Sequence, residues 1–173
     1  MSGSKHGAGD DAPWIAELGR LVAARVASGR RTVGFCFGAQ LMAQALGGAA
    51  TPAGYWELGT RELDFPNDAS QKKIRVHQLH RDAVSTLPPG AVLLASSRRC
   101  EHEIWSLGAR ALAIQGHPEM SEAVLRGLIE SRADLIGKEA VAEALVTFDA
   151  NPVRPSDTAH LVTLCKKYLK KEA

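Results

Sequence analysis

A strand-forming run enters a Gly-x-Cys-x-Gly turn and is followed at once by a helical pattern. Residues 32–40 read Thr-Val-Gly-Phe-Cys-Phe-Gly-Ala-Gln, and residues 40–46 continue as Gln-Leu-Met-Ala-Gln-Ala-Leu. This order predicts a strand, a sharp turn and a helix, with Cys36 at the turn. Flanking glycines permit a strained turn that holds the side chain above a sheet, and the positive end of the helix dipole favours a thiolate. Cys36 is therefore a candidate nucleophile, and the alternative is a buried structural cysteine in a tight connection.

A candidate base for Cys36 follows a second strand-like run. The apolar residues 111–115 end in Gly-His-Pro-Glu at 116–119, and a helical pattern comes next. In an α/β sheet the cysteine and the histidine would both lie at carboxyl ends of strands, where such folds place their chemistry. Glu119 can hold the His117 imidazole in one tautomer, since the intervening proline stiffens the turn. Together these residues predict a Cys/His/Glu triad, although a lone His-Pro-Glu would be read as a surface turn.

The two motifs, Gly-Phe-Cys-Phe-Gly-Ala-Gln and Gln-Gly-His-Pro-Glu, resemble the signature pair of class I glutamine amidotransferases. Further stretches are similar to stand-alone members that include the plant γ-glutamyl peptidases: residues 2–6, 9–15, 80–82 and 164–169. The similarity covers nearly the whole chain. It implies an α/β, flavodoxin-like fold with Cys36 as nucleophile, His117 as base and Glu119 as the group that orients the base.

The resemblance also implies a reaction. The Cys36 thiolate would attack a γ-glutamyl amide, His117 would protonate the departing amine, and water would hydrolyse the γ-glutamyl thioester. The developing oxyanion needs two backbone donors: the N–H of Phe37 and, by resemblance, one from the loop at Gly3. No cofactor is expected. The substrate is either glutamine, which releases ammonia, or a γ-glutamyl peptide such as glutathione or its conjugates.

Four polar residues are candidates for substrate binding. The resemblance implies that Gln40 lines the glutamyl pocket and that His80, Arg81 and Asp82 face the α-amino and α-carboxylate groups of the substrate. The alternatives are a plain helix surface for Gln40 and a polar loop for residues 80–82. No metal site is expected, because His77, His80 and Asp82 have no further ligands at zinc-like spacing.

Three functions remain open. A stand-alone γ-glutamyl hydrolase is favoured, because the chain contains no synthetase domain and no Gly-x-x-x-x-Gly-Lys phosphate loop. The first alternative is a glutaminase subunit that delivers ammonia to a separate synthetase. The second is a non-catalytic, truncated remnant that acts as a binding protein.

The start of the chain carries a further expectation. In the family the glycine loop follows two strands and a helix, whereas here it follows Met1 directly. We therefore expect an N-terminally truncated version of the fold that lacks its first strands and the tether of the Gly3 loop. The strand before Cys36 would then have an open edge, through which the chain could self-associate.

Composition predicts one domain over residues 1–173, since the chain is 45% hydrophobic and 23% charged. A net charge of +2 and dispersed basic residues, apart from Lys166-Lys167 and Lys170-Lys171, argue against nucleic-acid binding. The three cysteines have no paired spacing, and the sequence shows no signal-peptide pattern and no long apolar run. These features indicate a cytosolic protein without a membrane segment.

Patterning places the remaining elements. A helix over 14–26 is expected to be capped by Asp10 or Asp11, with Pro13 in its first turn. Cys100 is expected in an exposed loop, Cys165 on the apolar face of the last helix, and Trp56 and Trp105 in packing roles. The expected strands are 31–35, 59–63, 74–78, 91–95, 103–107 and 111–115, the last two paired across 108–110, and the later helices are 121–135, 138–147 and 158–170.

Overall fold

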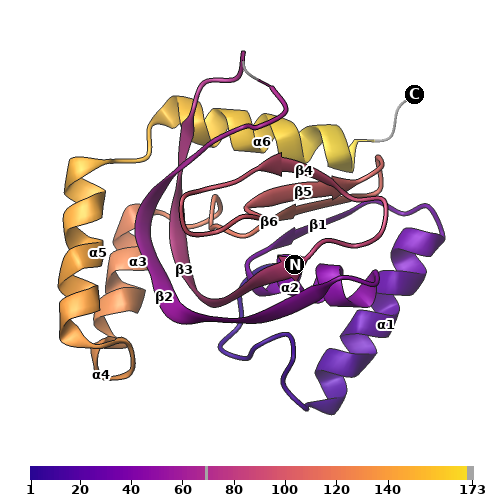
Figure 1. The fold of residues 1–173 in the computed structure, drawn as a ribbon, viewed down its shortest axis with the longest axis horizontal. Helices are drawn as coiled ribbons and strands as arrows, with labels where there is room; N and C mark the ends of the chain where they lie inside the picture. Colours follow the sequence, from indigo (N-terminus) through magenta and orange to yellow (C-terminus); the bar gives the residue numbers. More distant parts are fainter. Residues whose placement is uncertain (69, 171–173) are drawn as a thin grey trace.

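A four-stranded mixed sheet lies at the centre of the computed structural model, which describes residues 1–68 and 70–170 (Figure 1). Its strand order is β1-β6-β5-β4. β1 (Thr32–Phe35) runs parallel to β6 (Ala111–Ile114), whereas β5 (Ile104–Leu107) is antiparallel to both β6 and β4 (Val92–Ala95). The expected pairing of the last two strands across residues 108–110 is therefore confirmed.

A second, two-stranded ribbon curves around one end of this sheet (Figure 1). It consists of β2 (Ala49–Leu63) and β3 (Ile74–Thr86), which pair antiparallel. Both strands are much longer than the sequence pattern predicted. Pro52 and Gly54 read as turn residues, but a register shift between Pro52 and Glu57 accommodates them inside β2.

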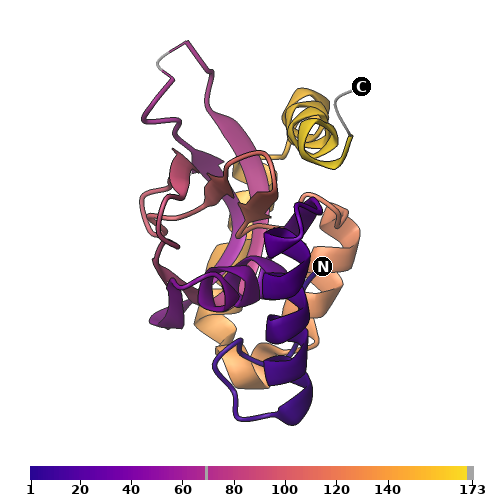
Figure 2. The same cartoon turned by 90° about the vertical axis from the view of Figure 1, so that its right-hand side faces the viewer.

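Helices cover the strands in groups. α1 (Pro13–Ala27) packs against α2 (Phe37–Ala45), and α5 (Lys138–Ala150) packs against β2. α6 (Pro155–Leu169) contacts β1, β3 and β6, and Figure 2 shows it to one side of the β2–β3 ribbon. The helix expected over 121–135 is broken into α3 (Glu122–Glu130) and α4 (Ala133–Ile136).

The core explains why β6 is apolar throughout. Successive strand residues face opposite sides of a sheet. Ala111 and Ala113 pack in a cluster with residues of α1 and α2, while Leu112 and Ile114 pack in a second cluster with residues of α6. The sheet is therefore covered on both faces. Trp105 is fully buried in the first cluster, as its predicted packing role requires.

Two local predictions were wrong. Ala12, not an aspartate, precedes α1 and makes no side-chain cap, because Asp10 instead accepts a hydrogen bond from the Gly7 backbone N–H and pairs with His6. Cys100 is 4% exposed rather than in an exposed loop. Paired hydrogen bonds between Ser97 and Cys100 close a turn that directs the cysteine inward. Cys165 lies beside the second cluster on α6, as predicted.

The N-terminal residue is paired with the central sheet. The Met1 nitrogen donates to the Val33 carbonyl at 2.9 Å, and the Phe35 N–H donates to the Met1 carbonyl at 2.8 Å. The expectation that the Gly3 loop lacks a tether was therefore wrong. Within residues 1–68 and 70–170, β1 pairs with β6 on one side and with Met1 on the other.

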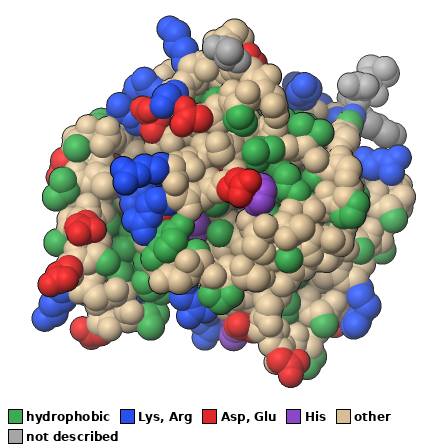
Figure 3. Space-filling model, in the orientation of Figure 1, with side chains coloured by type: hydrophobic (Ala, Val, Ile, Leu, Met, Phe, Trp, Pro, Cys, Tyr) green, Lys and Arg blue, Asp and Glu red, His purple; other side chains and the backbone are tan. Residues whose placement is uncertain are grey.

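Surface charges are mixed. On the face shown in Figure 3, basic side chains lie in separate groups, several of them beside acidic ones. Lys166 and Lys167 lie in the last turn of α6, whereas Lys171 is outside the described residues. Over the described part of the chain, no helix is both long enough and apolar enough to cross a bilayer.

Candidate active site

Cys36 occupies a strained turn between β1 and α2. Its φ of 49° and ψ of −112° make it the one non-glycine residue with positive φ in the described part of the chain. Such a conformation costs about 1–3 kcal/mol and persists only where the surroundings enforce it. A Cβ atom on Gly34 would lie 2.6 Å from the Gly38 backbone, and one on Gly38 would lie 2.8 Å from Met1 Cβ. Both glycines of the motif are thus required by close packing around the cysteine.

His117 and Glu119 form a hydrogen-bonded pair after β6. The His117 N–H donates to the His77 carbonyl at 2.8 Å, which fixes the backbone of the turn. His117 Nδ1 lies 2.9 Å from Glu119 Oε1, and the Ser2 hydroxyl donates to the same oxygen at 2.5 Å. The carboxylate, whose side chain is 26% exposed, is therefore held from both sides.

The electrostatics of this pair favour a charged imidazole beside Cys36. Burial alone would lower the pKa of His117, but its contacts with the Cys36 and Glu119 side chains outweigh burial and raise the pKa to about 10. Burial would raise the pKa of Glu119, but its hydrogen bonds with His117 and Ser2 lower it. An imidazolium next to a cysteine stabilises the thiolate, which is the nucleophilic form.

Both predicted oxyanion residues lie at the same pocket as Cys36. Phe37 is the first residue of α2, where backbone N–H groups have no acceptor within the helix. Gly3 faces His117: a Cβ atom added there would lie 3.0 Å from the imidazole Cε1. The structure thus brings Gly3, which is far from Cys36 in sequence, to the same pocket as Cys36 and Phe37.

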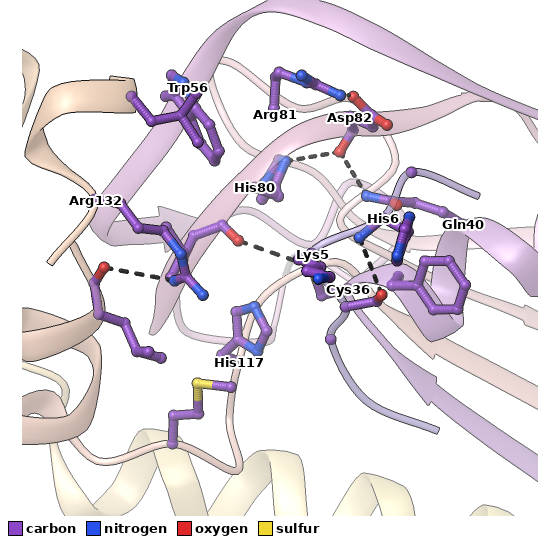
Figure 4. A pocket seen from close by; sticks show the side chains of 18 residues that line it. Lys5, His6, Cys36, Gln40, Trp56, His80, Arg81, Asp82, His117 and Arg132 are labelled. Atoms are coloured by element: carbon purple, nitrogen blue, oxygen red, sulfur yellow. Dashed lines mark hydrogen bonds and ion pairs between the residues drawn. The ribbon is translucent and has the colours of Figure 1, made fainter. Parts of the chain in front are cut away.

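A pocket of about 280 Å³ opens beside Cys36 and His117 (Figure 4). All four predicted binding residues line it: Gln40, His80, Arg81 and Asp82. The Asp82 carbonyl organises this wall, since Gln40 Nε2 donates to it at 2.6 Å and His80 Nδ1 lies 2.9 Å from it. Gln40 is thus a buried pocket residue and not part of a plain helix surface.

Residues 80–82 differ in their exposure and charge. His80 is buried, and burial lowers its pKa to about 3, so that its imidazole is neutral. The Asp82 side chain is 14% exposed and forms an ion pair with the exposed Arg81 at 3.2 Å. The wall therefore presents one negative and one positive group near the cysteine. No cluster of three or more potential metal ligands occurs within residues 1–68 and 70–170.

Sequence reasoning missed the opposite wall of the pocket. This wall consists of Trp56 from β2 together with Met120, Leu128, Arg132 and Leu135 from the segment that contains α3 and α4. Trp56 does pack against the core cluster of α3 and α5, as expected, but it also lines the pocket. No motif marked Arg132, and only the tertiary contact of the helices with β2 and β3 places it at the site.

The fold and the site define an α/β protein with a cysteine elbow beside a His/Glu pair. The family model described as glutamine amidotransferase class-I matches residues 8–128. The chain belongs to the class I glutamine amidotransferase family.

Individual relatives agree with this assignment. Gamma-glutamyl peptidase 3 of Arabidopsis thaliana is 30% identical over 98% of this chain and 73% of its own length. The GMP synthase of Bordetella avium is 34% identical over 65% of this chain and 24% of its own length. A solved glutamine amidotransferase from Thermotoga maritima superimposes with a TM-score of 0.80 at 21% identity, over 98% of this chain and 76% of that one. The chain is a hydrolase-type enzyme of this family, with relatives among the γ-glutamyl peptidases.

Proposed function

We propose that this protein hydrolyses γ-glutamyl amide bonds through a γ-glutamyl thioester on Cys36. One observation carries the proposal: a single pocket brings Cys36 and His117 together with the charged pair Arg81 and Asp82. The first two residues are the nucleophile and base that acyl transfer needs, and the charged pair complements an α-amino acid group. The relatives named γ-glutamyl peptidase support the same substrate class.

The reaction would have two halves. The Cys36 thiolate attacks the δ-carbonyl carbon of the glutamyl group, and the oxyanion accepts hydrogen bonds from the N–H groups of Phe37 and Gly3. The C–N bond then breaks while His117 donates its proton to the departing amine. In the second half, water attacks the thioester and gives its proton to His117, which releases glutamate and the Cys36 thiolate.

The wall formed by α2 and β3 would bind the glutamyl group. The Asp82 carboxylate suits the α-ammonium of the substrate, and the Arg81 guanidinium suits its α-carboxylate. Gln40, held by the Asp82 carbonyl, and neutral His80 complete this wall. Suitable substrates are γ-glutamyl peptides such as glutathione and its conjugates.

A second candidate is a glutaminase that passes ammonia to a separate synthetase. The observation in its favour is the similarity to the GMP synthases of Bordetella avium and Campylobacter lari. The two candidates share the chemistry at Cys36. They differ in what leaves the glutamyl group, which is ammonia in one case and an amino acid or peptide in the other.

Glutamate release from the purified protein tests the proposal. γ-Glutamyl dipeptides and glutamine are supplied separately, and Cys36→Ala is compared with Cys165→Ala, which removes a thiol away from the pocket. We expect Cys36→Ala to lose about a thousandfold or more of the turnover and Cys165→Ala to keep it. Turnover that persists in Cys36→Ala would refute the mechanism. Faster release from glutamine than from the dipeptides would favour the glutaminase.

A further inference from the structure

The pocket has a second wall that the glutamyl group does not need. In Figure 4, Gln40 and Asp82 lie to the right, on the Cys36 side of the pocket, and Trp56 and Arg132 lie to the left, with His80 between the two groups. His117 must reach the nitrogen of the leaving amine, so the leaving group extends away from the glutamyl wall. The wall that contains Trp56 and Arg132 is therefore where a leaving group larger than ammonia would lie.

Arg132 directs an unpaired charge into this space. Its side chain points toward His117 in Figure 4, and its hydrogen bond to the Leu128 carbonyl, at 3.5 Å, is a long one. Within the described residues Arg132 has no carboxylate partner, whereas the neighbouring Arg126 pairs with both Glu122 and Asp149. A half-buried guanidinium with free donors matches the bidentate geometry of a carboxylate.

Apolar side chains line the pocket together with this guanidinium. Arg132 lies between α3 and α4, and Leu128 on α3 and Leu135 on α4 line the same pocket. Trp56 and Met120 complete the wall. Leu135 remains 68% exposed, which leaves apolar area at the rim available to a ligand.

We infer that Arg132 binds the carboxylate of the leaving group, and that the preferred leaving group is an amino acid or short peptide with an apolar side chain. This inference rests on the proposed function and names its substrate class. The pocket lining carries one negative group, Asp82, and three positive groups, Arg81, Arg132 and Lys5, and a γ-glutamyl dipeptide carries one ammonium and two carboxylates. Glutamine has no second carboxylate and would leave Arg132 unused.

The test compares γ-glutamyl-leucine with γ-glutamyl-leucinamide, which lacks only the charge of the leaving carboxylate. For the unaltered protein we expect kcat/KM to be about 10- to 100-fold higher for the free acid. Arg132→Met should remove this preference, so that the acid and the amide have similar values of kcat/KM. Arg132→Lys, which keeps the charge but not the bidentate geometry, should keep part of the preference. Arg126→Met, which changes a residue of α3 outside the pocket, should keep all of it.

Binding to the Cys36→Ala protein separates this inference from the proposed function. Calorimetry should give a lower Kd for γ-glutamyl-leucine than for the amide, and the difference should vanish when Arg132→Met is added. Such a result would support the inference even if the unaltered protein hydrolysed neither compound. Equal effects of Arg132→Met on acid and amide, in binding or in turnover, would overturn it.

Discussion

The charge on His117 depends on a small number of contacts. Cys36 and Glu119 raise its pKa to about 10 against the effect of burial, while Ser2 holds the carboxylate in place. Because the folded-state pKa is raised to about 10, the imidazole stays charged at neutral pH and loses its charge as the pH rises through about 10. The alkaline limb of the activity profile should therefore report on these contacts.

Glu119→Gln should move this alkaline limb to lower pH. The amide keeps the shape of the side chain but removes the negative charge that raises the pKa of His117. We also expect kcat/KM at neutral pH to fall, by about 10- to 1000-fold, because the imidazole is held less firmly in one tautomer. A profile of kcat/KM against pH measures both effects. Ser2→Ala, which keeps the negative charge and removes only a hydrogen bond to it, should move the limb less, and an unmoved limb in Glu119→Gln would contradict this account.

Glu103 is a buried acid that the proposed mechanism does not use. Its side chain is 0% exposed and accepts a hydrogen bond from Gln78 Nε2 at 2.8 Å. Burial raises its pKa to about 7, although hydrogen bonds with Ser97 and Gln78 oppose the shift. Its backbone carbonyl accepts a hydrogen bond from the Gln115 N–H, two residues before His117. This carboxyl group therefore couples the stability of the strands below the site to pH.

Glu103→Gln should remove part of the pH dependence of stability. As the pH rises, the Glu103 carboxyl loses its proton near pH 4.5 in the unfolded chain but only near pH 7 in the folded protein. Its contribution to stability is therefore fully present below about pH 4.5 and falls as the pH rises to about 7. The resulting loss at pH 8 is on the order of 3 kcal/mol. Urea unfolding at pH 5 and pH 8 should show a smaller loss in the variant than in the unaltered protein. The same loss in both proteins would contradict the assignment.

Among helices and strands, β1 and α2 pack in direct contact at their junction. The space for a side chain at Gly34 is filled by the Gly38 backbone and by Met42 Sδ, both 2.6 Å from the position of a Cβ atom. The turn can therefore present Cys36 only while these two segments remain in direct contact.

Gly34→Ala should destabilise the protein by about 1–3 kcal/mol, because the added methyl group forces β1 and α2 apart. Gly127→Ala is the matched control: it lies on α3 with no atom within 4 Å of the added methyl group, and it should stabilise by about 0.5–1 kcal/mol. Thermal unfolding of the two variants measures both effects. Equal stability of Gly34→Ala and the unaltered protein would show that the junction is looser than the structure indicates.

Local sequence motifs predicted the strand, turns and helix that hold Cys36 and His117, whereas the remaining parts of the fold and the pocket depend on tertiary contacts. The strand, turn and helix around Cys36 and the turn after β6 could be read from the sequence, since glycines and apolar runs mark them directly. The extension of β2 through Pro52 could not, because only pairing with β3 keeps that segment extended. The same limit applies to Arg132, whose role depends on how the broken helix packs.

For the whole molecule, the site is assembled from segments spread over most of the chain. The N-terminal residues pair with β1 and contact Glu119, β3 supplies the wall proposed to bind the glutamyl group, and the α3–α4 segment also lines the pocket. The triad motifs therefore mark only part of the site. Binding and specificity depend on the β2–β3 ribbon and on the segment that follows His117.

Labelling with an electrophilic glutamine analogue tests the central claim most directly. A chloromethyl ketone in place of the side-chain amide should alkylate Cys36 within the pocket, and peptide mass mapping identifies the labelled residue. We predict that one of the three cysteines, Cys36, is labelled, that a γ-glutamyl dipeptide protects it, and that His117→Ala slows the reaction. Labelling of Cys100 or Cys165 instead, or labelling of Cys36 that the dipeptide does not slow, would contradict a glutamyl pocket built around this nucleophile.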